Sequence, residues 1–147
     1  MIYIGIDPGA KGGYAWIWDG TVKAMPWDDT FFVQDMHCLS ATGEGIIAAV
    51  EKVGPVHGNG IVSMFNFGKN AGYIEGVLIA IGIPYQLIPP IRWKKEFSLI
   101  NQNKQASIMT CKHLYPDLDL KRSDKCRTDS DGKAEATLLA EYARRNM

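Results

Sequence analysis

Hydrophobic and polar residues alternate at the start of the chain as they do in a β-strand with two unlike faces. Isoleucines occupy positions 2, 4 and 6, whereas the opposite face carries a tyrosine, a glycine and finally Asp7. The following "PGAKGG" has turn chemistry, and "YAWIW" at 14–18 resumes as a strand. A "DG" turn at Asp19 and Gly20 then leads to "TVKAMPW" at 21–27. We predict an antiparallel meander over this part of the chain.

The pattern changes in the middle of the chain. After a helical segment at 31–41, the run "GIIAAVEKV" at 45–53 is apolar up to Glu51, which is typical of a strand covered on both faces, although a helix also fits so short a run. Residues 62–82 predict a loop leading into an apolar helix, and "IPYQLIPP" at 83–90 predicts a strand closed by two prolines. Strand, helix and strand in this order imply parallel pairing through a right-handed crossover.

Two amphipathic helices complete the chain, at 103–116 and 131–145, with a polar loop between them. We therefore predict an α/β fold in which an antiparallel hairpin region joins a parallel half, with helices around the sheet. A chain of 147 residues without internal repeats fits one domain, so we expect a single domain over residues 1–147.

Composition narrows the class of protein. With 46% hydrophobic and 22% charged residues, the chain is an ordinary globular protein. No apolar run approaches the ~20 residues of a membrane span, and no secretory signal pattern begins the chain, so we expect a cytoplasmic protein with no membrane partner. The three cysteines form no disulfide framework. A zinc site at Cys111, His113 and Cys126 is the less favoured interpretation, because there is no C-x-x-C pair and no obvious fourth ligand.

Charge is segregated along the chain although the net charge is zero. Residues 1–91 carry four Lys/Arg and eight Asp/Glu, whereas residues 92–127 carry nine and four. An acidic chemical centre beside a basic docking segment would have this distribution, which is typical of proteins that bind nucleic acid. The alternative is a set of charges scattered over a solvated surface.

Carboxylates stand where apolar segments end or begin. Asp7 ends the first strand, and Glu51 stands near the end of the fourth. Asp131 and Glu135 begin the last helix, on one stripe with the apolar residues at 138, 139 and 142. If this stripe packs on the sheet, both acids point at the sheet too. Taken singly, Asp7 also suits a turn, Asp131 a helix cap and Glu51 a surface position.

Several buried carboxylates in one place are costly unless a cation is bound among them. Hard oxygen ligands select Mg²⁺ or Mn²⁺. Such a cluster commonly holds two divalent ions that activate a water and stabilise the leaving oxygen of a phosphodiester. The acids therefore predict metal-dependent phosphodiester hydrolysis, which requires no Ser, His or Cys nucleophile.

Several longer motifs follow one another in an order, and at spacings, that agree together with those of one protein family. They are "GIDPGAKGGYA" at the start, "VEKV" in the middle, "GYIEGVLIAIGIPY" as helix then strand, "RWKKEF" and "NKQAS" after it, and "DGKAEATLLAEYARR" at the end. Over almost its whole length the chain resembles the RuvC-type Holliday junction resolvases of the RNase H-like superfamily, and particularly their short phage and prophage branch. The resemblance implies an RNase H-like five-stranded mixed sheet, with antiparallel strands one to three, parallel strands four and five, and flanking helices.

The resemblance also implies roles for the acids. Asp7 matches the first-strand metal ligand, Glu51 the glutamate that ends strand four, and Glu135 the last-helix carboxylate. The implied cofactor is Mg²⁺ or Mn²⁺, with two ions per active site.

The fourth acid departs from the family pattern, which would place it at Gly132. We assign Asp131, because an i, i+4 pair with Glu135 still shares a helix face. Asp129 is the competing candidate.

Basic residues after the fifth strand would, by the resemblance, contact the DNA backbone near the cleaved phosphate. They are Arg92, Lys94, Lys95 and Lys104. Such contacts give affinity without reading sequence, and binding then depends on salt. A solvated surface is the alternative for each, and Trp93 among them is expected to anchor the core.

Aromatic residues could stack on unpaired bases. Bacterial members carry a wedge aromatic soon after the strand-four glutamate, but Gly54 stands there in this chain. Phe65 and Phe67 could stack on bases instead, with Lys69 and Asn70 on phosphate. The alternative is that both phenylalanines belong to the core.

We therefore expect a metal-dependent, structure-selective endonuclease that resolves Holliday junctions or other branched DNA in recombination or phage DNA processing. Because two opposed strands are cut, a symmetric homodimer is expected, and an apolar helix such as 73–81 would supply part of its interface or lie in the core. The resemblance implies the cytoplasm of a bacterial host cell. The alternatives are a flap or less selective branched-DNA nuclease and a non-cleaving junction-binding protein.

Overall fold

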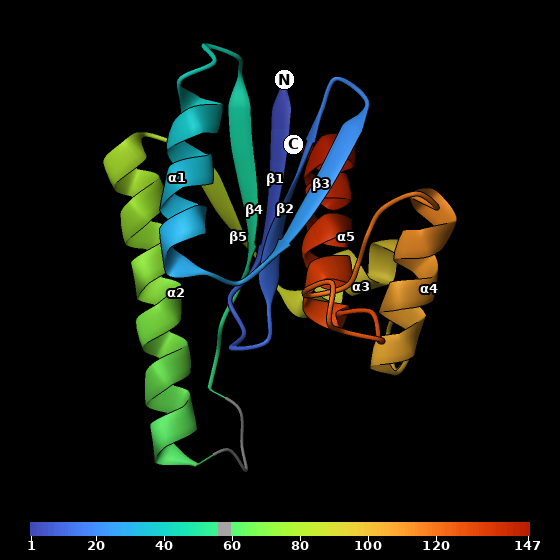
Figure 1. Cartoon of the computed structure of the whole chain (residues 1–147). Helices are drawn as coiled ribbons and strands as arrows, with labels where there is room; N and C mark the ends of the chain where they lie inside the picture. Colours follow the sequence, from blue (N-terminus) through green and yellow to red (C-terminus); the bar gives the residue numbers. More distant parts are fainter. Residues whose placement is uncertain (56–59) are drawn as a thin grey trace.

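The computed structural model describes residues 1–55 and 60–147 (Figure 1). A five-stranded sheet in the order β3-β2-β1-β4-β5 lies at its centre. The strands are β1 (Ile2–Asp7), β2 (Gly13–Trp18), β3 (Thr21–Pro26), β4 (Ile46–Glu51) and β5 (Tyr85–Ile88). Strands β1, β2 and β3 pair antiparallel, and β4 is parallel to both β1 and β5. The predicted five-stranded mixed sheet, with strands one to three antiparallel and strands four and five parallel, is confirmed.

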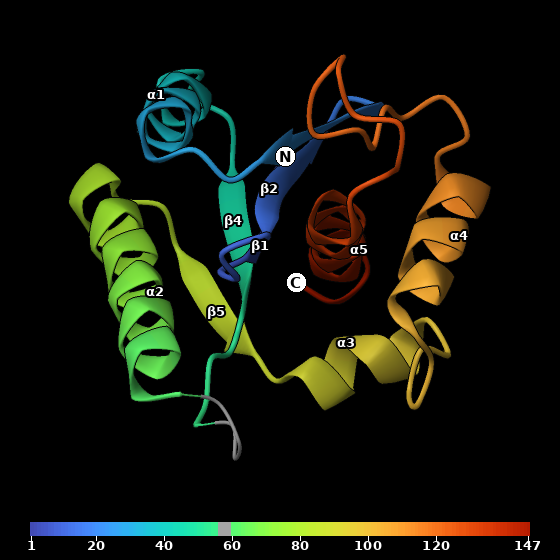
Figure 2. The ribbon, with the colours of Figure 1, turned by 60° about the horizontal axis from the view of Figure 1, so that its bottom comes forward.

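Helices cover both faces of the sheet (Figure 2). The helices are α1 (Asp29–Ser40), α2 (Ile61–Ile81), α3 (Pro90–Glu96), α4 (Lys104–Leu114) and α5 (Asp131–Asn146). Helices α1 and α2 lie on one face, whereas α5 lies on the other, with α3 and α4 packed beside it. Within the described residues, no helix has both the length and the apolar character that a membrane crossing demands.

The alternation along β1 separates two cores. Ile2, Ile4 and Ile6 are fully buried and pack with residues of α1 and α2, including Phe32 and Leu78. The opposite face of β1 meets α5. The strand thus has an apolar face and a face that ends in a carboxylate, as the sequence predicts.

Strand β4 is apolar on both faces because both faces are covered. Ala48 and Val50 belong to the core under α1 and α2, whereas Ala49 belongs to the core that contains α5. The strand interpretation of this run is confirmed, and the helical alternative is wrong.

Helix α5 lies directly on the backbone of β1. A Cβ atom at Gly5 would overlap the carbonyl oxygen of Ala136 and would lie 2.8 Å from the carbonyl carbon of Leu139. Only glycine permits this approach. The contact places the first turn of α5 over the end of β1, where Asp7 stands.

Two helical segments differ from the prediction. The predicted loop at the start of 62–82 is wrong, because α2 is one continuous helix that ends where Gly82 adopts a φ of 82°. Helix α3 was not predicted at all. Its Pro90 looks like a strand terminator in the sequence, but a proline in the first turn of a helix loses no hydrogen bond.

Candidate active site

The parallel pairing of β1 with β4 brings two of the predicted acids together. Ile6 pairs with Val50, so Asp7 and Glu51 follow at the same ends of neighbouring strands. The charges of Glu51, Asp131 and Glu135 all raise the pKa of Asp7, in addition to the larger effect of burial. The four acids proposed from sequence are therefore close enough to interact electrostatically.

The environment of Asp7 disfavours the ionised form of its carboxyl group. Burial, with the three neighbouring carboxylates, raises its pKa to about 7, although the N–H of Gly9 donates to its Oδ1 at 3.0 Å and opposes the shift. A buried carboxylate among like charges is unfavourable when ionised. A cation at this position would relieve the repulsion.

Glu51 is held by a buried tryptophan. The indole Nε1 of Trp93, on α3, donates to Oε1 of Glu51 at 2.9 Å, and Trp93 is fully buried. The expectation that Trp93 anchors the core is confirmed, but its contact with Glu51 was missed. The only signal in the sequence is that a buried indole N–H needs a hydrogen-bond acceptor.

Glu135 lies between two polar partners from α3 and α4. Burial is the main cause that raises its pKa, and the Lys94 ammonium, with Nζ 4.0 Å from Oε1, opposes it. The hydroxyl of Ser107 donates to the same Oε1 at 3.2 Å. Ser107 is a site neighbour that the sequence analysis did not find.

Asp131 pairs with Lys104, whose Nζ lies 2.6 Å from Oδ2. Burial acts to raise the pKa of Asp131, but the hydrogen bond and charge of Lys104 outweigh it and the pKa is lowered. Asp129 instead pairs with Lys112 of α4 at 2.5 Å. Of these two acids, Asp131 is therefore the one that acts on Asp7 and is engaged by Lys104.

The absence of an acid at position 132 has a steric cause. A Cβ atom at Gly132 would overlap the carbonyl oxygen of Lys11 and would lie 2.6 Å from Cα of Gly12. The turn after β1 thus rests on the first turn of α5. Any side chain at this position would push the two apart.

The four carboxylates offer only oxygen donors, which fits Mg²⁺ or Mn²⁺. Burial first, and then the charges of the neighbouring acids, raise the pKa of Asp7, and bound cations would oppose both effects. Over residues 1–55 and 60–147, however, no three Asp, Glu, His or Cys side chains gather tightly enough to hold a metal as they stand. Of the three residues in the less favoured zinc interpretation, Cys111 lies buried.

The arrangement of strands and helices matches solved structures of RuvC. A structure of RuvC from Thermus thermophilus matches with a TM-score of 0.55 and 17% identity, over 99% of this chain and 96% of that one. A second, of T. thermophilus RuvC in complex with Holliday junction substrate, matches with a TM-score of 0.57 and 16% identity, over 99% and 97%. The chain has the fold of RuvC. No protein-family model and no curated protein sequence matches it.

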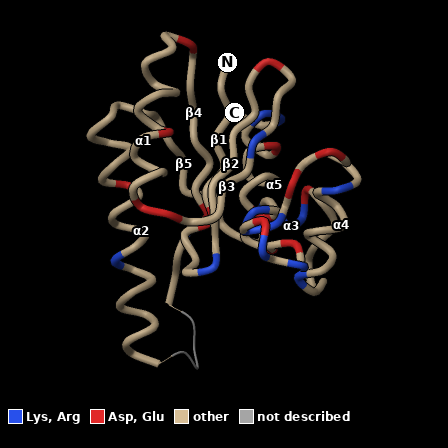
Figure 3. The backbone as a smooth tube through the Cα atoms, viewed as in Figure 1, with Lys and Arg blue, Asp and Glu red and all other residues tan. Residues whose placement is uncertain are grey.

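On this RuvC fold the predicted DNA-binding residues form two groups. Lys94 and Lys104 lie at the acids, and Arg92 and Lys95 are exposed on α3. Most Lys and Arg lie on the side of α3, α4 and α5 (Figure 3). The segregation of charge in the sequence therefore becomes a segregation in space.

The second group lies on α2. Lys69 is exposed, and Phe65 is 71% exposed, so the core alternative is wrong for Phe65. Phe67 is half-buried and lines a hollow of about 640 Å³ with Trp27. The amide of Asn70 donates to the Pro8 carbonyl at 2.6 Å rather than pointing freely outward.

The wedge position remains a prediction without a structural counterpart. Gly54 is exposed, and a Cβ atom added there would meet nothing within 4 Å. Residues 56–59 of the loop that follows lie outside the described residues.

Proposed function

We propose that the protein is a divalent-metal-dependent endonuclease that resolves Holliday junctions or related branched DNA, in recombination or phage DNA processing. The observation that carries the proposal is the half-buried Asp7 carboxylate, which stands beside Glu51 at the ends of two parallel strands and is close enough to Asp131 and Glu135 for their charges to raise its pKa. The fold shared with RuvC, one of whose structures is in complex with Holliday junction substrate, supports it.

In this proposal Asp7, Glu51, Asp131 and Glu135 hold two Mg²⁺ or Mn²⁺ ions. Bound divalent ions supply activation of a water and stabilisation of the leaving oxygen of a phosphodiester. Asp7 would be the central residue of this set, because the charges of the other three acids all raise its pKa. Lys104 pairs with Asp131 and is largely exposed. In the complex it would leave Asp131 and bind a DNA phosphate instead.

The remaining surface has a proposed role in binding branched DNA. Arg92 and Lys95 of α3 would contact backbone phosphates with Lys94 and Lys104. Phe65, exposed on α2, would stack on unpaired bases, with Lys69 beside it and Phe67 at the hollow below.

We also propose that residues 1–147 act as one nuclease domain and form a symmetric homodimer in the cytoplasm. Two cuts in opposed strands require two active sites. Ile61, Val62 and Ile79 of α2 are 89%, 73% and 67% exposed, which supports an interface along this helix. Ile74 and Leu78 are buried, so part of the predicted interface segment 73–81 belongs to the core.

The test compares cleavage of four-way, flap and linear DNA in Mg²⁺ and in Mn²⁺. We expect four-way junctions to be cut fastest, and Asp7→Asn to abolish cleavage while junction binding persists. Asp124→Asn makes the same change at an exposed acid of the α4–α5 linker and should leave cleavage intact. If flaps are cut faster than four-way junctions, the proposed activity becomes that of a flap or less selective branched-DNA nuclease.

A non-cleaving junction-binding protein is the second candidate function. Two observations favour it: Lys104 already neutralises Asp131, and no tight group of three acids is preformed in the described part of the chain. Wild-type protein that binds four-way junctions but never cuts them in either metal would establish this candidate and end the nuclease proposal.

A further inference from the structure

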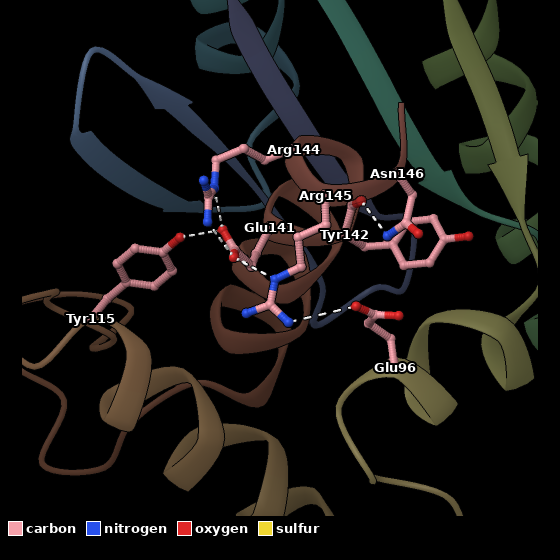
Figure 4. A network of polar contacts seen from close by, with 7 residues as sticks. All are labelled: Glu96, Tyr115, Glu141, Tyr142, Arg144, Arg145 and Asn146. Carbon is pink, nitrogen blue, oxygen red and sulfur yellow. Dashed lines mark hydrogen bonds and ion pairs between the residues drawn. The ribbon is translucent and has the colours of Figure 1, made fainter.

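Glu141 is a buried carboxylate in the last third of α5. It is 1% exposed and accepts four hydrogen bonds: one from Tyr115 Oη at 2.6 Å, two from Arg144 at 2.7 Å, and one from Arg145 at 2.7 Å (Figure 4). Burial alone would raise its pKa, but these partners outweigh burial and lower the pKa to about 2. The residue is therefore a charged hub inside the protein.

The partners of Glu141 reach the two helices beside α5. Tyr115 is the C-cap residue of α4. Arg145 also pairs with Glu96, the last residue of α3, at 3.5 Å, and its guanidinium lies 5.1 Å from the ring centre of Phe97. Figure 4 shows two arms of this network meeting at Glu141: one is Tyr115, and the other runs from Glu96 through Arg145. One buried carboxylate thus ties the ends of α3 and α4 to α5.

The same two helices supply the side chains that contact the candidate ligands. Trp93 and Lys94 of α3 contact Glu51 and Glu135 respectively, and Ser107 of α4 also contacts Glu135. Lys104, in the first turn of α4, contacts the remaining helix acid. A shift of α3 or α4 relative to α5 would therefore change how three of the four carboxylates are oriented.

We infer that Glu141 is a positioning residue for the metal site, acting through α3 and α4. It lies six residues beyond Glu135, about 9 Å along the helix axis, so it does not ligate the same ions. It keeps the partners of the acids in place, as outer-shell residues do around metal ligands. The inference rests on the proposed function, because that function requires the metal site.

The test follows Mn²⁺ binding without DNA or cleavage. Mn²⁺ is paramagnetic, and the indole N–H signal of Trp93, identified by its loss in Trp93→Phe, should broaden when the ion binds beside Glu51. The midpoint of the titration is the Mn²⁺ concentration at which the Trp93 signal has lost half of its intensity. We expect Glu141→Gln to raise this midpoint about tenfold. The titration is run at a temperature at which circular dichroism shows every variant to be folded.

Two control variants separate positioning from general stability. Leu78→Ala removes a buried side chain from the opposite core and destabilises the fold, and Glu44→Gln makes the same chemical change at the exposed start of the sheet. Both should stay within twofold of the wild-type midpoint. A midpoint that moves equally in Leu78→Ala and Glu141→Gln, or that does not move in Glu141→Gln, overturns the inference.

Two milder variants keep the inference testable if Glu141→Gln does not fold. Tyr115→Phe removes the arm to α4, and Glu96→Gln removes the arm to α3. Each should raise the midpoint two- to threefold, and no change with either overturns the inference. Absence of broadening in the wild type is a different failure, because it removes the metal site itself and with it the proposed function.

Discussion

The two faces of the sheet are built differently. Under α1 and α2, the isoleucines of β1 pack against apolar side chains such as Phe32 and Leu78. Under α5, Gly5 lets two backbones touch. The buried polar and charged side chains in the described residues belong to α4, to α5 or to its N-cap, and they are Ser107, Ser130, Lys133, Thr137 and Glu141. Both faces bury apolar side chains, but the face under α5 buries polar and charged side chains beside them.

The largest expected effect is at the backbone contact. Gly5→Ala should lower the free energy of unfolding by about 4 kcal/mol, because the new Cβ meets main-chain atoms that cannot move aside. Gly72→Ala makes the same change on exposed α2, where nothing lies within 4 Å, and should stabilise by up to about 1 kcal/mol. Chemical denaturation measures both. Equal effects would show that the two faces do not differ in this way.

A somewhat smaller loss is expected on the apolar face. Leu78→Ala should cost about 3 kcal/mol of unfolding free energy, because it leaves a cavity in a fully buried site. Broadening of the Trp93 signal by Mn²⁺ should be unchanged in the folded variant, since Trp93 lies in the other core. A large change in the Mn²⁺ response would mean that the faces are coupled.

Removing the buried charge should stabilise the metal-free protein. The pKa of Asp7 is 3.8 without the fold and about 7 in the folded chain, so ionisation opposes folding increasingly above pH 4 and fully above pH 7. Asp7→Asn in the presence of a chelator should gain about 2 kcal/mol at pH 8, since each pKa unit corresponds to about 1.4 kcal/mol and relaxation reduces the total.

The pH dependence provides the control for this prediction. At pH 4 Asp7 is protonated in the folded protein, so the gain should disappear there, while the Gly9 N–H keeps an oxygen acceptor in the asparagine. Denaturation curves at the two pH values measure the difference. A gain that is the same at pH 4 would assign the stabilisation to something other than charge.

The smallest effect on stability is expected at the exposed ion pair. Lys104→Gln should change the free energy of unfolding by less than about 1 kcal/mol, because Lys104 is 78% exposed. If Lys104 contacts a phosphate, the salt dependence of junction binding should fall by about one unit of slope. Lys23→Gln, on the exposed edge strand β3, should leave that slope unchanged and serves as the control.

Much of the fold follows from local patterns in the sequence. Alternation along residues 2–7 predicts the two faces of β1, and the continuous apolar run up to Glu51 predicts a strand covered on both sides. Acids at the ends of neighbouring parallel strands are then expected at one edge. That strand four lies beside strand one, which brings Asp7 and Glu51 together, was implied by the resemblance to RuvC-type resolvases and not by these local patterns.

Contacts between distant segments could not be predicted in this way. Trp93 and Glu51 are 42 positions apart, and only the path of α3 brings the indole to the carboxylate. Helix α3 itself was missed because the two prolines at its start resemble a strand terminator. Glu141 looks like an exposed helical residue beside two arginines, yet it is buried.

The alternation of the segments, the positions of the carboxylates along them and the location of the basic part of the chain can all be read from the order of the residues, because they depend on neighbours within a few positions. Other properties appear only in the folded chain. Gly132 has no room for a side chain, Lys104 meets Asp131 while Lys112 meets Asp129, and the pKa of Asp7 is raised to about 7 by burial and by the neighbouring acids. These properties depend on distances and burial set when α5 packs on β1, and no local pattern encodes them.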